Sequence, residues 1–212
     1  MGKIEQDRRT ENRAATVFRP VLVDTNHFGG FCLMRNLSST GMMGKVYTAF
    51  AVGTAVMIQF DDALAVTGVT VWSKDGLIGV RFDEEIDVAE VLSLSRRRVN
   101  GGKPLRAPRL SIRERAEVVV ENRSLQVEVL DISQRGAKVA ASILDTEDEV
   151  VLVLKGMEPR KAMVRWTQSG IAGLKFHTVL EFEQLADWVI GRQQLMASEQ
   201  GTGSDFLRLG SG

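Results

Sequence analysis

Hydrophobic and polar residues alternate along several short stretches of this chain, and such stretches predict β-strands. The clearest are 116–120 and 125–130, which flank a polar turn at 121–124. Short runs rich in β-branched residues follow at 150–154, 162–166 and 172–176, and Gly170 supplies a positive φ in the turn before the last of them. No helical spacing interrupts these strands. The pattern favours an antiparallel barrel or sandwich over a parallel sheet.

The same pattern occurs twice, because the chain contains an internal repeat. Residues 71–82 align without a gap with 165–176, and both blocks share a tryptophan, two glycines and a final phenylalanine. Residues 36–42 align with 131–137, and residues 9–13 align with 109–113, at nearly the same offset. Three blocks in one order predict two copies of a domain of about a hundred residues each.

Each copy ends in a stretch with the spacing of a helix. Residues 86–98 carry Ile86, Ala89, Leu92 and Leu94, with cations at the carboxyl end, where the helix dipole favours them. Residues 180–196 place Leu185, Trp188, Val189 and Leu195 on roughly one face. The Gly- and Pro-containing stretch 99–108 is the expected linker. We therefore expect domains at 1–98 and 109–198 and a flexible tail at 199–212.

Composition narrows the classes of function. The 212 residues include 27 basic and 27 acidic side chains, so the formal net charge is zero. A general binder of long nucleic acids or acidic membranes carries a basic excess, so we expect neither as a partner and expect any anion site to be local. The apolar runs are too short to cross a bilayer, and the amino terminus lacks the apolar stretch of a secretory signal. We expect a cytoplasmic protein without membrane insertion.

Signatures of catalysis are missing from the sequence. His27 and His177 have no second metal ligand at a characteristic spacing. Cys32, the single cysteine, has no neighbouring Cys or His and is interpreted as a small buried hydrophobe. Gly101-Gly102-Lys103 is followed by proline, which excludes a phosphate-binding loop. We therefore expect no enzyme, no metal and no cofactor.

A set of polar residues repeats along with the strands. Each copy has two arginines four apart ahead of its first strand, and later an Asp or Asn, a Ser and a Gly at a strand end. The sets are Arg9, Arg13, Asn36, Ser38 and Gly41, and Arg109, Arg113, Asp131, Ser133 and Gly136. An Asx turn with glycine at a positive φ would account for the Asp-x-Ser-x-x-Gly pattern taken alone. Both patterns occurring together, in order, twice, indicate a ligand site.

The residue types suit a small, doubly charged guanine nucleotide. Arginine binds phosphate through paired charge-assisted hydrogen bonds and stacks on bases. A carboxylate can accept from both donors on the Watson–Crick edge of guanine. Serine adds a short hydroxyl, and glycine lets a ligand approach the backbone.

The order of these motifs resembles that of the PilZ domain of bacteria: Arg-x-x-x-Arg, then Asp/Asn-x-Ser-x-x-Gly, then the block from tryptophan to phenylalanine. The resemblance covers nearly the whole chain outside the linker and the tail. The resemblance implies a mainly β fold of two six-stranded antiparallel barrels, each followed by a helix. It also implies a receptor for cyclic dimeric GMP (cyclic di-GMP), a second messenger that controls motility, exopolysaccharide and biofilm. Its arginines would bind phosphate and stack on guanine, Asp131 and Ser133 would contact guanine and the ligand edge, and Gly136 would permit the approach.

The first copy departs from this set at Asn36, whose amide offers one acceptor and one donor instead of two acceptors. We therefore predict a non-enzymatic cyclic di-GMP receptor whose domains rearrange on binding. The alternative is an adaptor in which one or both copies keep the fold and have lost the ligand. The large aromatics Trp72, Trp166, Phe82 and Phe176 are interpreted as barrel core. The downstream partner and the oligomeric state stay open.

Overall fold

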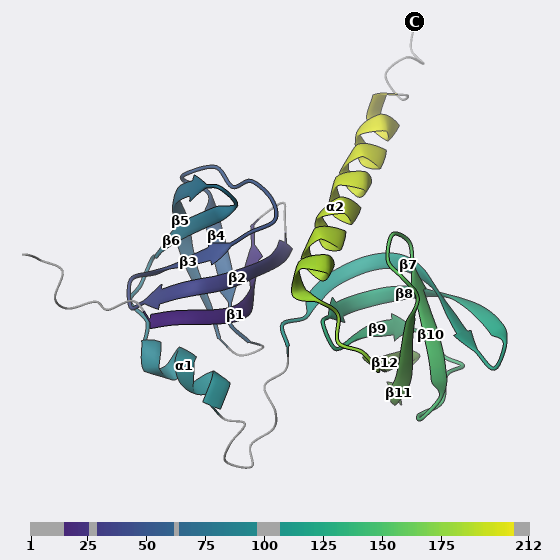
Figure 1. The fold of residues 1–212 in the computed structure, drawn as a ribbon. Coiled ribbons are helices and arrows are strands. Elements are labelled where there is room, and N and C mark those ends of the chain that lie inside the picture. The colour runs from purple at the N-terminus through teal and green to yellow at the C-terminus, as the bar shows by residue number, and fades with distance from the viewer. Residues whose placement is uncertain (1–14, 26–28, 62–63, 97–106, 206–212) are drawn as a thin grey trace, which may run out of the picture. The chain divides into compact units, whose positions relative to one another are not determined.

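The computed structural model describes residues 15–25, 29–61, 64–96 and 107–205. The chain divides into two compact units. The first consists of Met1–His27 and Phe31–Arg106, and the second consists of Phe28–Gly30 and Ala107–Gly212. Each unit holds one closed β-barrel and one helix (Figure 1). The expected domain boundaries at 98 and 109 stay a prediction.

The first barrel, barrel 1, has six antiparallel strands whose order around the barrel is β1-β2-β3-β6-β5-β4. A short helix, α1 (Val88–Arg96), follows it. The strands are β1 (Ala15–Asp24), β2 (Gly29–Ser38), β3 (Gly41–Lys45), β4 (Ala55–Gln59), β5 (Ala65–Lys74) and β6 (Leu77–Phe82).

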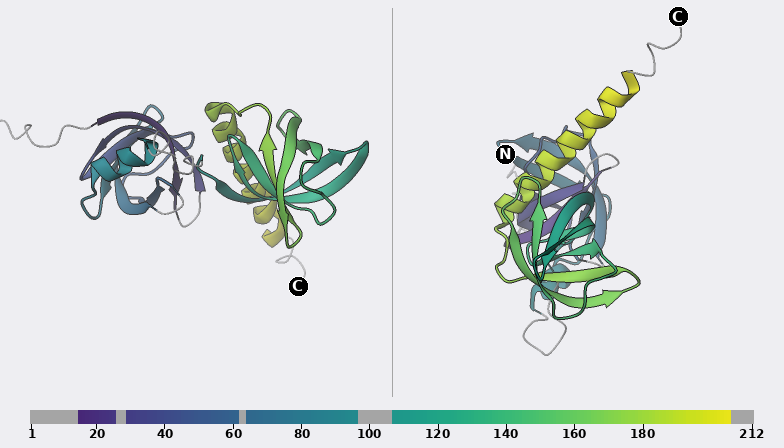
Figure 2. Two further views of the ribbon diagram at one scale, coloured as in Figure 1. Left: turned by 90° about the horizontal axis from the view of Figure 1, so that it is seen from below. Right: turned by 90° about the vertical axis from the view of Figure 1, so that its right-hand side faces the viewer.

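The second barrel, barrel 2, repeats this topology, with the order β10-β11-β12-β9-β8-β7. Its strands are drawn in teal and green in Figure 2. The strands are β7 (Leu110–Val120), β8 (Arg123–Ser133), β9 (Gly136–Ala140), β10 (Glu149–Leu154), β11 (Arg160–Gln168) and β12 (Ile171–Phe176). Helix α2 (Phe182–Asp205) follows and continues into the stretch that was expected to be a tail. The predicted fold class, two six-stranded antiparallel barrels with a helix after each, is confirmed.

Tight turns set the register of three hairpins. In each of these hairpins, both central residues of the turn have a positive φ. The three turns are Asp75–Gly76, Ser169–Gly170 and Glu121–Asn122. Two-residue turns of this kind match the right-handed twist of the strands that they join. The positive φ expected at Gly170 is confirmed, and the turn at 121–122 is two residues shorter than the predicted one.

The barrel interiors are apolar, and the aromatic residues divide between inside and outside. Phe82 and Phe176 are buried, as predicted. The prediction was wrong for the two tryptophans, because Trp72 is 39% exposed and Trp166 is 40% exposed. A β-bulge lies directly before each one, between Thr70 and Trp72 and between Val164 and Trp166. An extra residue inverts the in–out alternation, so each indole points away from the core.

An arginine of the first strand holds α1 on barrel 1. Arg19 is buried in β1, and its guanidinium donates hydrogen bonds of 2.9 Å to the carbonyl oxygens of Val91 in α1 and of Phe60 after β4. Burial lowers the pKa of Arg19, while the charge of Asp61 acts in the opposite sense. Val91 of α1 is deeply buried and Ala89 is exposed, while the side chain of Leu94 lies outside the described residues.

An ion pair holds α2 on barrel 2 in a similar way. Glu114 of β7 is buried and accepts hydrogen bonds from Nη2 and, at 3.1 Å, from Nε of Arg192. Of the residues predicted to share one face of this helix, Leu185, Trp188 and Val189 are all buried. The side chain of Leu195 lies outside the described residues. Among the helices that the structure describes, none is long and apolar enough to cross a membrane.

Candidate functional site

Four residues on neighbouring strands form a row across the sheet of barrel 2. Asp131 of β8 pairs across the strands with Lys138 of β9. Lys138 pairs on its other side with Gly173 of β12, and Gly173 in turn pairs with Trp166 of β11. The residues at both ends of the row directly follow a β-bulge. One bulge lies between Val129 and Asp131, and the other lies between Val164 and Trp166. The bulges bring a carboxylate, an ammonium group and an indole to one row of the sheet.

The Asp131 carboxylate lies between two cations. Nη1 of Arg109 is 2.7 Å from Oδ1, and Nζ of Lys138 is 2.8 Å from Oδ2. The Asp131 side chain is only 9% exposed, so both ion pairs are shielded from water on the carboxylate side. Two cations around one carboxylate leave a local excess of positive charge on a chain with no net charge. This arrangement favours an anionic ligand.

Arg113 lies within β7, and not ahead of the first strand as the sequence indicated. It stands at the irregularity between Ser111 and Glu114, where the pairing of β7 with β8 shifts. Its side chain is 83% exposed, and its Nη1 is 3.7 Å from Oε1 of Glu128. Exposed ion pairs of this length contribute little in water. The guanidinium can therefore exchange Glu128 for a phosphate at small cost.

Ser133 and Gly136 close the hairpin between β8 and β9. The buried Ser133 hydroxyl donates to the Gly136 carbonyl oxygen at 3.1 Å and accepts from the Arg135 backbone N–H at 3.3 Å. A Cβ on Gly136 would collide with the Leu174 carbonyl oxygen on the neighbouring strand. Gly136 does not have a positive φ, so the close approach of β12 explains this glycine. Contact of these two residues with a ligand stays a prediction.

Barrel 1 contains the same row with neutral residues. Asn36 of β2 pairs with Met43 of β3, Met43 with Gly79 of β6, and Gly79 with Trp72 of β5. A bulge between Met34 and Asn36 again precedes the first member. The amide of Asn36 and the thioether of Met43 replace the carboxylate and the ammonium group of barrel 2. The scaffold of the site is therefore shared by the two barrels while its charge is not.

The hairpin of barrel 1 repeats two of the contacts of barrel 2. The Ser38 hydroxyl donates to the Gly41 carbonyl oxygen at 3.1 Å, and a Cβ on Gly41 would collide with the Val80 carbonyl oxygen. Arg9 and Arg13, the two predicted arginines of this copy, lie outside the described residues.

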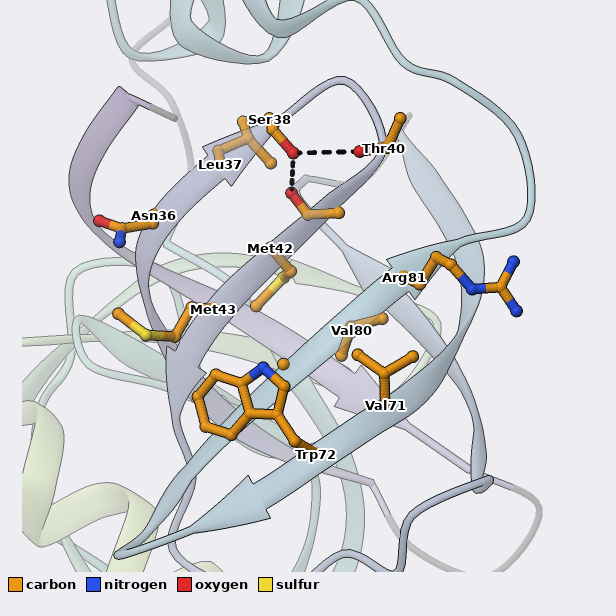
Figure 3. A pocket seen from close by; sticks show the side chains of 12 residues that line it. Asn36, Leu37, Ser38, Thr40, Met42, Met43, Val71, Trp72, Val80 and Arg81 are labelled. Carbon is orange, nitrogen blue, oxygen red and sulfur yellow. Dashed lines mark hydrogen bonds between the residues drawn. The ribbon is translucent and has the colours of Figure 1, made fainter. Parts of the chain in front are cut away.

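A pocket of about 310 Å³ opens beside the row of barrel 1. Among its lining residues are Asn36, Ser38, Gly41, Met43, Trp72 and Arg81 (Figure 3). Figure 3 shows the Arg81 guanidinium extending away from Asn36 and Trp72. The volume is at the lower end of the range for small-molecule sites. The structure thus brings together the three predicted residues of this copy that it describes.

The tryptophans are the site residues that the sequence did not predict. In each barrel the five-membered ring of the indole occupies the space that a Cβ on the paired glycine, Gly79 or Gly173, would need. Each indole is thus seated against a strand and keeps part of its surface in solvent. Exposed aromatic rings beside cationic groups are the usual stacking surface for nucleotide bases. Lys138 was also missed, because its pairing with Asp131 is visible only in the register of β8 with β9.

Other reactive groups lie apart from the rows. Within the described residues, no group of three or more His, Cys, Asp or Glu could hold a metal ion. Cys32 is fully buried, and burial raises the pKa of its thiol to about 12. Nε2 of His177 lies 2.6 Å from Oε2 of Glu149, on the surface of barrel 2.

Two antiparallel barrels of one topology, each with a row of residues that ends in an indole, define a tandem barrel protein. The family comparison agrees with this class, because the PilZ domain matches residues 7–98 and 105–191. The chain therefore belongs to the PilZ domain family, whose receptors are non-enzymatic binding proteins.

Solved structures with similar folds include PlzA of Borreliella burgdorferi in complex with c-di-GMP, at 10% identity and a TM-score of 0.40 over 85% of this chain and 94% of that one. YcgR of Escherichia coli in complex with c-di-GMP has 10% identity and a TM-score of 0.35, with 88% of both chains covered. The inhibitor of motility of Bacillus subtilis has 14% identity and a TM-score of 0.33, over 85% and 98%. Likenesses this weak transfer no site geometry. A search of curated proteins finds no match.

Proposed function

We propose that this protein is a cytoplasmic, non-enzymatic receptor for cyclic di-GMP and that barrel 2 carries its stronger site. The supporting observation is the Asp131 carboxylate, held between Arg109 and Lys138 in a row that ends at Trp166. Membership of the PilZ domain family supports the class of ligand.

The chemistry of each group fits one part of such a ligand. Asp131 can accept from the two donors on the Watson–Crick edge of guanine, because each carboxylate oxygen has more than one acceptor site. The indole of Trp166 offers a surface on which a base can stack. Arg109 and Arg113 can each bind a phosphate through their planar guanidinium groups. Arg109 would then exchange Asp131 for phosphate as the ligand enters.

This exchange gives the receptor a means of changing shape. Arg109 directly follows the stretch 99–108 that joins the two copies, and its guanidinium donates a hydrogen bond to Asp131. Transfer of Arg109 to the ligand changes where that stretch is held, and the two barrels rearrange in response. We propose that this change regulates motility, exopolysaccharide or biofilm processes. Small-angle scattering with and without ligand measures it.

A second candidate function applies to barrel 1. Its row of Asn36 and Met43 has no charge, which favours a weaker site or a surface kept only for a protein partner. In that case the chain is a receptor at barrel 2 and an adaptor at barrel 1.

Calorimetric titration of the ligand-free full chain with cyclic di-GMP tests the proposal. We expect binding in the micromolar range or tighter, and loss of at least one site in the double variant Arg109→Ala/Arg113→Ala. The double variant Arg123→Ala/Lys155→Ala removes two exposed cations elsewhere on barrel 2 and is expected to bind like the wild type. Absence of heat with the wild type would refute the proposed function.

A further inference from the structure

We propose that Lys138 is a positioning residue of the barrel 2 site: it keeps the Asp131 carboxylate in place and its charge compensated while Arg109 moves to the ligand phosphate. The inference rests on the proposed function and extends it to a residue outside the repeated arginine and Asp-x-Ser-x-x-Gly patterns.

The two cations hold different oxygens of Asp131 from different kinds of structure. Lys138 lies within β9, between its cross-strand partners Asp131 and Gly173, so its backbone is fixed in the middle of the sheet. Arg109 precedes the first residue of β7. Lys138 binds Oδ2 and Arg109 binds Oδ1, so either partner can leave while the other stays.

The shielding of Asp131 makes a permanent partner necessary. A carboxylate that is 9% exposed cannot replace a lost cation with water, and an uncompensated charge at such a position is costly. If Arg109 left and Lys138 were absent, Asp131 would lose both cations at the moment when it must face guanine. With Lys138 present, Oδ2 keeps one charge-assisted hydrogen bond and still has a free acceptor site.

The other barrel provides an internal comparison. Met43 occupies the position of Lys138 and pairs with Asn36, which has no charge to compensate. The acidic residue and the cation therefore occur together in one barrel and are both absent from these two positions in the other. The cation thus occurs only in the barrel that has the carboxylate it pairs with.

Titration of Lys138 variants with cyclic di-GMP tests the inference. The variants are made in the full chain carrying Arg9→Ala/Arg13→Ala, so that barrel 2 is measured without the arginines of barrel 1. We expect Lys138→Met to weaken binding about tenfold, the value of one hydrogen bond to a charged group. Lys138→Arg restores most of the affinity. Lys175→Met removes an exposed cation of the same barrel and leaves the affinity unchanged.

A double-mutant cycle separates positioning of Asp131 from a direct contact with the ligand. If Lys138 acts through Asp131, Lys138→Met weakens binding much less in a chain that already carries Asp131→Asn. Thermal unfolding of each variant without ligand shows whether an affinity change follows loss of fold. Equal affinities of Lys138→Met and the parent would overturn the inference and leave the proposed function intact. Absence of binding by the parent would overturn the function of barrel 2 itself.

Discussion

Trp166 occupies the space that a side chain on Gly173 would need, and Trp72 stands in the same relation to Gly79. The pairing joins a bulged strand, which turns the indole out of the core, to a strand that has no Cβ beneath it. Each member explains the other, because the indole can lie against the sheet only where glycine faces it.

Substitution of Gly173 by alanine is therefore expected to displace the indole. The new Cβ meets the Nε1 and Cε2 atoms of Trp166, and overpacking of this kind costs about 1–3 kcal/mol. We expect a lower free energy of unfolding, a changed tryptophan emission spectrum and weaker binding of cyclic di-GMP.

Gly191→Ala is the matched control for that substitution. A Cβ at Gly191 in α2 meets nothing within 4 Å, so this helical substitution is expected to be neutral or stabilising by about 0.5–1 kcal/mol. If Gly173→Ala behaved like Gly191→Ala, the seating of Trp166 on Gly173 would be wrong.

Transfer of the charged pair to barrel 1 is expected to strengthen its site. In a chain carrying Arg109→Ala/Arg113→Ala, the double variant Asn36→Asp/Met43→Lys recreates the Asp131–Lys138 pair on the same row. We expect about a tenfold gain in affinity for cyclic di-GMP over that parent, measured by calorimetry. Met43→Lys alone, which adds the cation without its carboxylate, is the control. No gain in the double variant would show that the row's charge does not set the difference between the barrels.

Breaking the Glu114–Arg192 pair is expected to destabilise barrel 2. The two side chains are only 6% and 18% exposed, and loss of one partner of such a pair costs about 3–5 kcal/mol because the other charge stays buried. Arg192→Ala should lower the midpoint of urea unfolding accordingly. Replacement of both residues by leucine should recover most of this loss, and a double variant as unstable as Arg192→Ala would contradict the explanation.

Cys32 is expected to be inert in the folded protein. Burial raises the pKa of the thiol to about 12 from an ordinary value of 9.0. At pH 8 about one thiol in ten thousand is then ionised, so a disulfide reagent should label Cys32 only after the protein is unfolded. Rapid labelling of the native chain would contradict the burial.

The same shift predicts how stability depends on pH. Between about pH 9 and 12 the unfolded thiol loses its proton while the folded one keeps it, which favours unfolding. The free energy of unfolding should therefore fall by about 1.4 kcal/mol for each pH unit in this window. A Cys32→Ala variant lacks this contribution, so the difference between the two urea-unfolding curves isolates it. Parallel pH profiles for the two proteins would rule out the shift.

The strand pattern and the repeat predicted two copies of an antiparallel barrel or sandwich. The resemblance to the PilZ domain specified two six-stranded barrels, as the structure has them. The site could be predicted only in part. Asp131 and Arg109 are brought together, but Ser133 and Gly136 are engaged in closing their hairpin.

The missed residues have one physical cause. Two-residue periodicity places Trp166 on the same face as Val164, and therefore in the core, but the bulge between them inverts the alternation. A bulge depends on the pairing of two strands, so a single strand does not reveal it. The bulge before Asp131 likewise obscures which residues share its face, and the partnership with Lys138 appears only in the register of β8 with β9.

The difference in charge between the two rows also affects how such a chain would respond to its ligand. Barrel 2 presents Asp131 with Lys138, whereas barrel 1 presents Asn36 with Met43. Two sites that differ in this way would bind cyclic di-GMP at different concentrations. A duplicated receptor of this kind would have two thresholds, and its output would cover a wider range of signal strength than two identical sites would allow.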